Sequence, residues 1–158
     1  MSSDSKRKRY QRLYNQLKDL LGSTDNRASR LATIEAILHH KIQYYFWTGV
    51  YMLRDGELLV ESYQGPVACQ KLKKDIGVCW AAINQNKTLV VPNVHEFPGH
   101  IACNSATNSE VVVPLRDKDG TVIGCFDVDS KELNSFDEVD AEELEKILDL
   151  VNTVPVKK

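Results

Sequence analysis

Residues 92–115 gather several groups that can do chemistry into one short polar segment. The segment contains Cys103, Glu110 and the histidines His95 and His100, together with an Asn/Ser-rich turn between two apolar runs. Such a loop adds little to a hydrophobic core, whereas binding and catalytic residues are concentrated on loops that a rigid scaffold positions. We therefore expect the functional site to include this segment.

Four cysteines extend this chemistry along the chain. They are too few for a disulfide framework in 158 residues, so in a reducing cytosol they are candidates for redox, catalytic or metal chemistry, with packing as the alternative for each. A zinc site would gather Cys69, Cys79 and Cys103 with a histidine. The sequence lacks the C-x₂-C and H-x₃-H spacings that zinc sites usually show, which counts against this interpretation.

Three of the cysteines occupy positions that suit a reactive thiol. Cys79 is expected in the first turn of a helix, and Cys103 precedes Asn104 and Ser105, which can cap a short helix. A helix N-terminus favours the thiolate form of a cysteine. Cys69 lies in a loop that contains Gly and Pro. This set fits a nucleophile that becomes a sulfenic acid and a resolving thiol that condenses with it.

The remaining cysteine and the two histidines have simpler interpretations. Cys125 lies inside an apolar strand and is expected to serve packing. His95 and His100 flank Gly99 and could activate a thiol as a base, but a loop histidine is more often a hydrogen-bonding strut. Both roles of the histidines stay open at this point.

Glu110, Asp127 and Asp129 form a candidate acidic group. Strand alternation places Asp127 and Asp129 on one face. Carboxylates brought together raise one another's pKa values, so one can stay protonated near neutral pH and donate a proton while the others hold a cation such as an ammonium. The alternatives are a solvated strand end and an oxygen-ligand cation site, although three carboxylates are few ligands for calcium.

Trp47 and Tyr51 share one face of a predicted strand, opposite Val50 and Met52. If that face lines a pocket, the rings can hold a small apolar or sulfur-bearing group. The residues alone favour a place in the hydrophobic core.

Helical periodicity predicts the elements that surround these groups. Two amphipathic helices precede the first strand, one ending at Gly22 and the next beginning at an Asp25 N-cap, and a third begins at a Ser135/Glu138 capping box and stops at Pro155. A short helix is expected over residues 77–87 and brief strands on either side of it. The result is an α+β domain.

Period-two alternation predicts the sheet. Asp55-Gly56 is a strong signal for a type I′ hairpin turn, and a second hairpin is expected to turn at residues 118–120. The sheet is therefore expected to be antiparallel.

Composition limits the classes of function. With 158 residues, 42% hydrophobic and 27% charged, we expect one domain over residues 1–158, with residues 1–9 as a disordered basic tail. The basic run Lys6–Arg9 also allows a localisation or nucleic-acid patch. A formal net charge of −2 gives no general attraction to nucleic acid or anionic membrane. No apolar run approaches the roughly 20 residues of a membrane span, and no export signal is evident, so we expect a cytoplasmic protein.

Five motifs identify a resemblance. The chain resembles the free methionine-(R)-sulfoxide reductases, single-domain enzymes with a GAF-like fold, over most of its length from about Asp25 onward. Ordinary ligand-binding GAF domains lack this set of cysteines and acids. The motifs are WTGVYML at 47–53, QGPVAC at 64–69, GVCW at 77–80, FPGHIACNSATNSEVVVPL at 97–115 and VIGCFDVDS at 122–130.

The resemblance implies a fold and a redox cycle. The fold has a central antiparallel sheet, N-terminal helices and a C-terminal helix on one face, and a loop-covered ligand pocket on the other. By position, Cys103 corresponds to the nucleophile that attacks the sulfoxide and becomes a sulfenic acid. Cys69 corresponds to the main resolving thiol and Cys79 to an auxiliary one, and thioredoxin reduces the resulting intramolecular disulfide.

The resemblance also implies a substrate site. Glu110, Asp127 and Asp129 correspond to acids that bind the substrate ammonium and assist protonation of the sulfoxide oxygen. Trp47 and Tyr51 correspond to aromatic residues around the substrate methyl group, which makes the pair pocket residues. The family implies no metal and no cofactor.

One residue departs from the family pattern. Where the family more usually has an aliphatic residue, this chain has Cys125, and by parity it shares the face of Asp127 and Asp129. We therefore hypothesise that Cys125 pairs with a nearby thiol under oxidation.

The leading prediction is an oxidoreductase that reduces free L-methionine-(R)-sulfoxide with thioredoxin. The breaking of an S–O bond needs a soft nucleophile at sulfur and an acid at oxygen, and a free amino acid brings an ammonium that an acidic pocket can select. The alternatives are a non-catalytic GAF-type sensor of a small molecule or of redox state, and a zinc-stabilised interaction module. The sequence leaves the oligomeric state open, a homodimer included.

Overall fold

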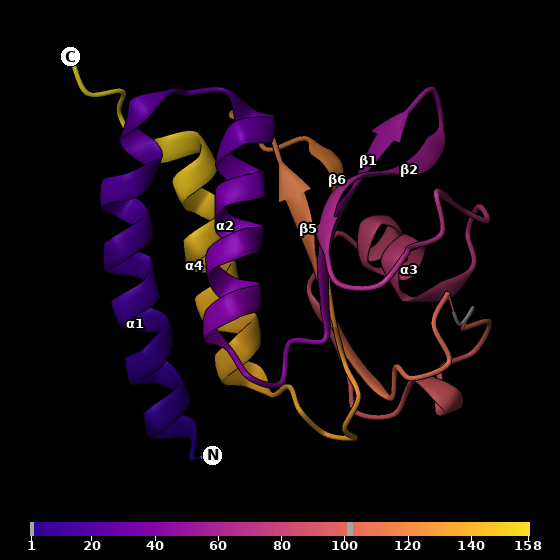
Figure 1. The fold of residues 1–158 in the computed structure, drawn as a ribbon. Helices are drawn as coiled ribbons and strands as arrows, with labels where there is room; N and C mark the ends of the chain where they lie inside the picture. The colour runs from indigo at the N-terminus through magenta and orange to yellow at the C-terminus, as the bar shows by residue number, and fades with distance from the viewer. Residues whose placement is uncertain (1, 101–102) are drawn as a thin grey trace.

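Six strands form one antiparallel sheet in the computed structural model, which describes residues 2–100 and 103–158 (Figure 1). The elements along the chain are α1 (Ser3–Leu20), η1 (Leu21–Ser23), α2 (Arg27–Lys41), β1 (Trp47–Arg54), β2 (Glu57–Gln64), β3 (Lys71–Leu72), α3 (Gly77–Gln85), β4 (Leu89–Val91), η2 (Val94–Glu96), β5 (Ser109–Arg116), β6 (Val122–Ser130) and α4 (Glu138–Thr153). Across the sheet the strands follow the order β3-β2-β1-β6-β5-β4.

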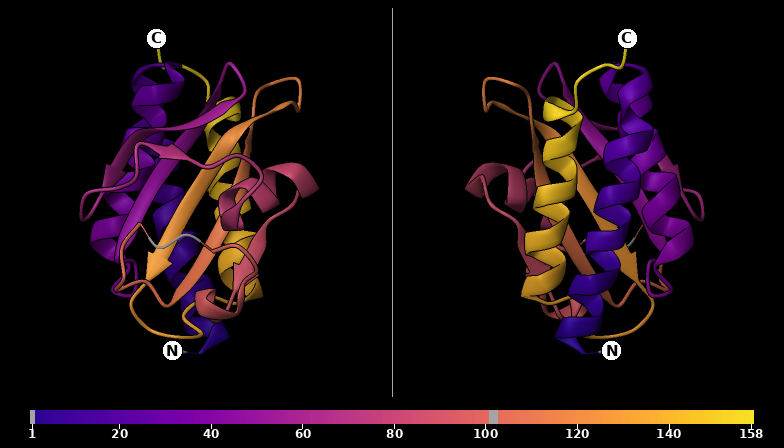
Figure 2. Two further views of the ribbon diagram at one scale, coloured as in Figure 1. Left: turned by 90° about the vertical axis from the view of Figure 1, so that its right-hand side faces the viewer. Right: turned by 90° about the vertical axis from the view of Figure 1, so that its left-hand side faces the viewer.

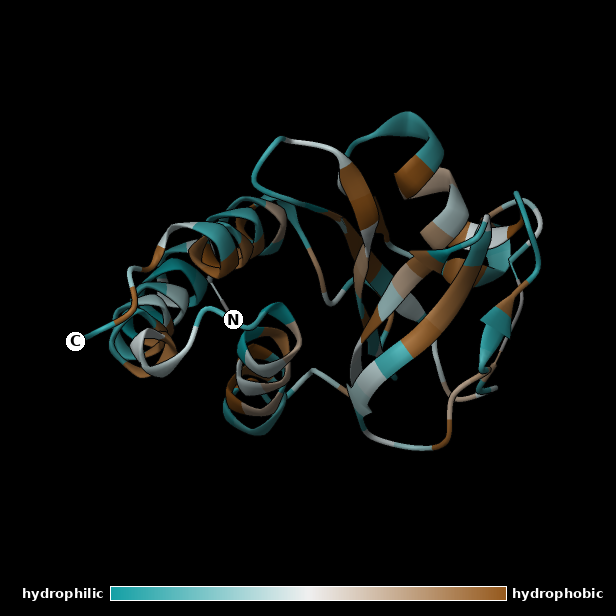
Figure 3. Cartoon of the chain, turned by 90° about the horizontal axis from the view of Figure 1, so that it is seen from above, coloured by the Kyte–Doolittle hydropathy of each residue, from teal (hydrophilic) through white to brown (hydrophobic). Residues whose placement is uncertain are grey.

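The sheet separates two layers of different character. On one face α2 and α4 contact the strands, and α1 packs across these two helices from outside. On the other face α3 packs against β5 and β6. Figure 2 shows the three long helices across one face and α3 with its loops across the other, and the view from above shows hydrophobic strand positions between the two layers (Figure 3). The α+β class and the expected helical layer are confirmed.

Alternation along β1 supplies two hydrophobic cores. Val50 and Met52 belong to the core beneath the long helices, whereas Trp47 and Tyr51 belong to a second core on the α3 side, as the alternation predicted. We call this second group the pocket-side core. Its buried members are Trp47, Tyr51, Leu58, Val78, Cys79, Trp80, Ala82, Val91, Val94, Val112 and Cys125.

The predicted hairpin turns form as expected. Asp55 and Gly56 both have positive φ, 52° and 78°, as a type I′ turn requires. Gly120 in the second hairpin has a φ of 85°, in the left-handed region that suits glycine. The β5–β6 hairpin and the β1–β2 hairpin therefore fix the register of the central strands.

Two predicted helix caps are displaced by one or two residues. The N-cap of α2 is Asn26, whose side chain accepts a hydrogen bond from the Ser29 amide, and not Asp25. At α4 the capping box joins Asp137 and Asp140, and not Ser135 and Glu138. The Ser135 hydroxyl hydrogen-bonds Ser130 and the Glu132 carbonyl, so it is not available as a cap.

The expected disordered tail over residues 1–9 is wrong for the residues that the structure describes, because α1 begins at Ser3. Lys6 is buried, and its Nζ atom lies 2.6 Å from Oδ2 of the fully buried Asp140 on α4. Arg7 likewise donates to Glu143 of α4 at 2.8 Å. These basic residues neutralise acids of the C-terminal helix, a pairing that local sequence cannot reveal. Met1 lies outside the described residues.

No helix within 2–100 and 103–158 combines the length and the apolar composition needed to cross a membrane.

The Lys6–Asp140 pair predicts a large difference between two neighbouring lysines. We expect Lys6→Met to lower the free energy of unfolding by about 3 kcal/mol, because it leaves a buried carboxylate without its cation. Lys8, whose side chain is 69% exposed and pairs with the exposed Asp4, is the control. Lys8→Met should change stability by less than about 0.5 kcal/mol in the same urea titration. Equal effects of the two substitutions would contradict the packing of α1 on α4.

Candidate active site

A pocket on the α3 side of the sheet brings together residues from distant parts of the chain. Strands β1, β5 and β6 form its floor, α3 forms one wall, and the loops around Val67 and Cys103 complete it. Of the eight residues predicted for the site, seven line this pocket: Trp47, Tyr51, Cys79, Cys103, Glu110, Asp127 and Asp129. The eighth, Cys69, is bonded to one of the seven.

A disulfide links Cys69 to Cys103, with the Cα atoms 5.6 Å apart. Cys103 is exposed and reaches the pocket from a turn, and Cys69 is half-buried. The short helix considered after Cys103 does not form. Instead Oδ1 of Asn104 accepts a hydrogen bond from the Ala106 amide at 2.8 Å, which makes an Asx turn that satisfies the backbone locally. Ile101 and Ala102 of the same motif lie outside the described residues.

Cys79 occupies the first turn of α3, as predicted, but it is not placed as a thiolate. Contact with the Cys125 thiol, burial, and the nearby Asp127 and Glu110 carboxyl groups raise the pKa of Cys79 well above the usual range. The helix terminus is outweighed because the side chain is only 5% exposed and faces acids. The expectation of an anionic Cys79 is therefore wrong.

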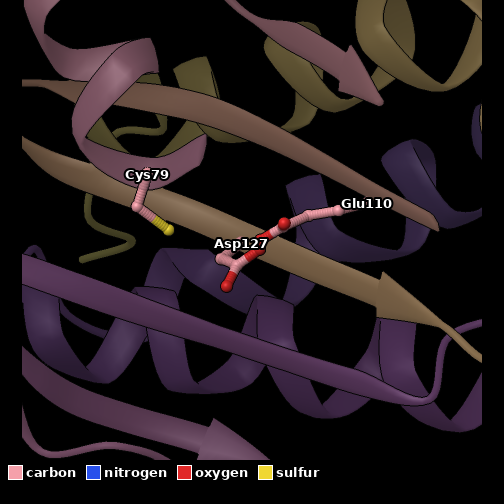
Figure 4. A group of neighbouring side chains, drawn as sticks. All are labelled: Cys79, Glu110 and Asp127. Atoms are coloured by element: carbon pink, nitrogen blue, oxygen red, sulfur yellow. The ribbon is translucent and has the colours of Figure 1, made fainter. Parts of the chain in front are cut away.

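The three acids form one buried group. Glu110 on β5 pairs in register with Asp129 on β6, and Asp127 lies two residues away on the same strand. Cys79 points from α3 toward Asp127, and Glu110 points to the same place (Figure 4). One donor atom each of Cys79, Glu110 and Asp127 lies within 4.8 Å of the others. Glu110 and Asp127 are buried and Asp129 is half-buried, so the solvated-strand alternative does not hold.

Burial controls the protonation of this group. It raises the pKa of Asp127, and it raises the pKa values of Glu110 and Asp129 well above the usual range with a further contribution from the Asp127 charge. The carboxyl groups of Glu110, Asp127 and Asp129 affect one another's protonation, so they titrate as a group. The group therefore keeps protons at a pH where isolated carboxyl groups lose them.

Two carboxyl oxygens of the acid group have no hydrogen-bond partner among the described residues. Among the described residues, Oδ1 of Asp127 and Oδ1 of Asp129 are buried without a hydrogen-bond partner. An unpaired buried acceptor is costly, so a donor from a ligand would be bound favourably there. The Asp127 charge raises the pKa values of its two neighbours, so a retained negative charge lies beside protonated carboxyl groups, and an ammonium can bind there. The zinc set considered from the sequence does not assemble, since two of its cysteines form the disulfide.

Trp47 and Tyr51 form an aromatic wall that also holds the Cys69 loop. Their rings stack with centroids 5.9 Å apart. Nε1 of Trp47 donates to the Pro66 carbonyl at 3.0 Å, and the Tyr51 hydroxyl donates to the Cys69 carbonyl at 3.2 Å. Gly49 makes room for the indole, because a Cβ at that position would come within 2.8 Å of it. Both aromatic residues are part of the pocket-side core and of the pocket.

The residues that line the pocket also include His100 and Thr107. His100 is half-buried, burial lowers its pKa, and its Nε2 atom is buried with no partner in the described part of the chain. Its position ahead of Cys103 was the only signal for it. Thr107 is buried beside the acids, and nothing in the sequence pointed to it. His95, by contrast, hydrogen-bonds Asn108 at 2.8 Å, as a strut would.

Known proteins share this fold and much of this sequence. The profile of the GAF domain family matches residues 32–153. GAF domain-containing protein A of Dictyostelium discoideum is 44% identical over 153 residues, which cover 96% of each chain. The free methionine-R-sulfoxide reductase of Escherichia coli (strain K12) is 36% identical over 118 residues, 75% of this chain and 71% of its own.

A solved structure agrees with these relatives. The X-ray structure of free methionine-R-sulfoxide reductase from Neisseria meningitidis, in complex with its substrate, has a TM-score of 0.85 and 35% identity, and the match covers 90% of this chain and 85% of that chain. The expected GAF-like fold is confirmed.

The raised pKa values of the acids predict how stability depends on pH. The native chain holds these protons more tightly than the unfolded chain, so unfolding releases protons above about pH 4, and the free energy of unfolding contributed by the group falls as pH rises. Glu110→Gln removes one titrating group and should make the decline between pH 5 and pH 8 shallower. Urea titrations at both pH values test this, with the exposed Glu132→Gln as control. An unchanged slope in Glu110→Gln would show that the group is not protonated as described.

Proposed function

Since the chain belongs to the free methionine-(R)-sulfoxide reductase family of GAF domain proteins, we propose that it reduces free L-methionine-(R)-sulfoxide to L-methionine. The convergence of Cys103 and three acids, two of them buried and one half-buried, on one pocket carries the proposal. The pocket offers a soft nucleophile, proton-holding carboxyl groups and a cation site together, as reduction of a free amino acid sulfoxide requires.

The acids bind and orient the substrate. Its ammonium donates to the unpartnered oxygens of Asp127 and Asp129, which supplies the hydrogen bonds that these buried atoms lack. Its sulfur and methyl group pack against Trp47 and Tyr51, because sulfur contacts aromatic rings favourably. The sulfoxide oxygen then faces Glu110, which holds a proton because burial raises its pKa. Glu110 is the general acid in this arrangement.

The chemical step takes place at the reduced Cys103. Its sulfur attacks the sulfoxide sulfur while the oxygen receives a proton from the acid group. The oxygen passes to Cys103, which leaves free methionine and a cysteine sulfenic acid. The sulfoxide is reduced by two electrons and the cysteine is oxidised by two.

Cys69 resolves the intermediate. Its thiol attacks the Cys103 sulfenic acid, forms the disulfide and releases water. The disulfide between these residues and the hydrogen bonds from the aromatic wall to the Cys69 loop support this assignment. Cys79 is an auxiliary resolving thiol, and thioredoxin returns the disulfide to thiols. We place the protein in the cytoplasm, where such a reductant operates, and a homodimer is compatible with the proposal.

A non-catalytic GAF-type sensor is the competing function. The name of the Dictyostelium discoideum relative mentions only its GAF domain, so that relative is compatible with either function. A sensor of a small molecule has no need of an exposed cysteine bonded to a second one beside an acidic pocket, whereas a sensor of redox state would use such a pair. Nucleotide binding without sulfoxide turnover would favour the sensor.

Substitution of the nucleophile should abolish turnover. In an assay that couples NADPH consumption to thioredoxin, we expect wild-type protein to reduce the free R epimer and not the S epimer, and Cys103→Ser to reduce neither. Cys125→Val keeps Cys69, Cys79 and Cys103, the cysteines of the proposed redox cycle, and is the matched control. Turnover in Cys103→Ser equal to wild type would refute the assigned nucleophile, and failure of wild type to reduce the R epimer would refute the proposed function.

The acid group should select a free ammonium. Acetylation of the substrate amine removes its positive charge, and we expect kcat/KM for the R epimer to fall by on the order of 10- to 100-fold, since hydrogen bonds to a charged group contribute about 1.5 to 3 kcal/mol. Asp127→Asn should lower kcat/KM for the free substrate and leave the acetylated one nearly unaffected. Equal turnover of both substrates by wild type would show that the acids do not bind the ammonium.

A further inference from the structure

We propose that Cys79 and Cys125 reduce the Cys69–Cys103 disulfide by thiol–disulfide exchange and so form a second, internal disulfide. The fully reduced chain then reduces two sulfoxide molecules before it needs an external reductant. The inference rests on the proposed function and adds a second redox pair to it. It assigns a role to Cys125, which the basal cycle does not use.

The two thiols belong to one packed unit. Cys79 lies in the first turn of α3, Cys125 lies on β6, and α3 packs directly on this strand. Both are free thiols in the pocket-side core, 5% and 0% exposed. Cys125 precedes Asp127 by two residues and so shares its face, and Cys79 reaches that face from above (Figure 4).

The two thiols are neighbours in the pocket-side core, and Cys125 and the Asp127 carboxyl group are among the causes of the raised pKa of Cys79. Two buried free thiols on a helix and a strand that pack directly together need little rearrangement to join. Asp127 provides an acceptor for the proton that Cys79 must lose before it can attack.

Cys79 also connects this pair to the catalytic one, because it lines the same pocket as Cys103. Cys79 gives its proton to Asp127 and attacks Sγ of Cys103. The Cys79–Cys103 bond forms, the Cys69–Cys103 bond breaks, and Cys69 leaves as a thiolate that takes a proton from solvent.

A second exchange completes the transfer. Cys125 attacks Sγ of Cys79, which forms the Cys79–Cys125 bond and breaks the Cys79–Cys103 bond, and the departing Cys103 thiolate takes up a proton in place of the one that Cys125 loses. Exposed Cys103 is a good leaving group, since water stabilises its thiolate. Two electrons have then passed from the buried pair to the outer pair. The Cys79 and Cys125 thiols have been oxidised to a disulfide and the Cys69–Cys103 disulfide has been reduced to two thiols, so Cys103 is free to attack a second sulfoxide.

The stoichiometry of methionine formation tests the proposal. Fully reduced protein, freed of reductant, is mixed with excess free R sulfoxide, and methionine is counted per chain. We expect two for wild type and one for Cys125→Val, which keeps a side chain of similar size that suits a strand and cannot form a disulfide. No methionine from wild type would refute the proposed function, whereas one methionine from wild type would refute the second pair alone.

Peptide mapping identifies the bond independently of the variant. Cleavage after Lys and Arg places the four cysteines on separate peptides, 55–71, 75–87, 88–116 and 119–131. After turnover without reductant, wild type should yield 75–87 linked to 119–131, and Cys125→Val should yield no second disulfide. Two methionines per chain in both proteins, or a wild-type map without that linked pair, would overturn the proposal.

Discussion

The clustering of three carboxyl groups, two of them buried, in the pocket that Cys103 lines is the constraint on which the site depends. Glu110 and Asp129 meet because β5 and β6 pair in register, and Asp127 follows from the alternation of β6. Water cannot stabilise three charges there, so the group keeps protons and leaves two acceptor oxygens unpaired. The same arrangement that costs stability supplies an acid for the sulfoxide oxygen and a site for an ammonium.

The rest of the fold holds the sulfur chemistry against this acid group. The long helices cover one face of the sheet and leave the other to α3 and its loops (Figure 2). Trp47 and Tyr51 use their polar atoms to hold the Cys69 loop and their rings to form the pocket wall. A single strand, β1, thus couples the position of the proposed resolving thiol to the shape of the pocket.

Local patterns predicted most of the fold, and motif resemblance predicted seven of the residues that line the pocket. Hairpin turns and strand faces follow from neighbouring residues, so Asp55-Gly56 and the alternation of Trp47 and Tyr51 were decisive. Pairing between distant residues could not be predicted from local sequence. Lys6 lies in an ordered helix and its ammonium pairs with Asp140, which is far along the chain. The prediction of a thiolate at Cys79 was wrong for the same reason, because the sequence does not show that Asp127 lies near this thiol.

A crystal structure of Cys103→Ser with free L-methionine-(R)-sulfoxide would show directly how the acid group holds the substrate. We expect the substrate ammonium on Asp127 and Asp129, the sulfoxide oxygen within hydrogen-bonding distance of Glu110, and the sulfur facing residue 103 beside Trp47. A substrate bound elsewhere, or bound here with its ammonium turned to solvent, would contradict the proposed binding mode.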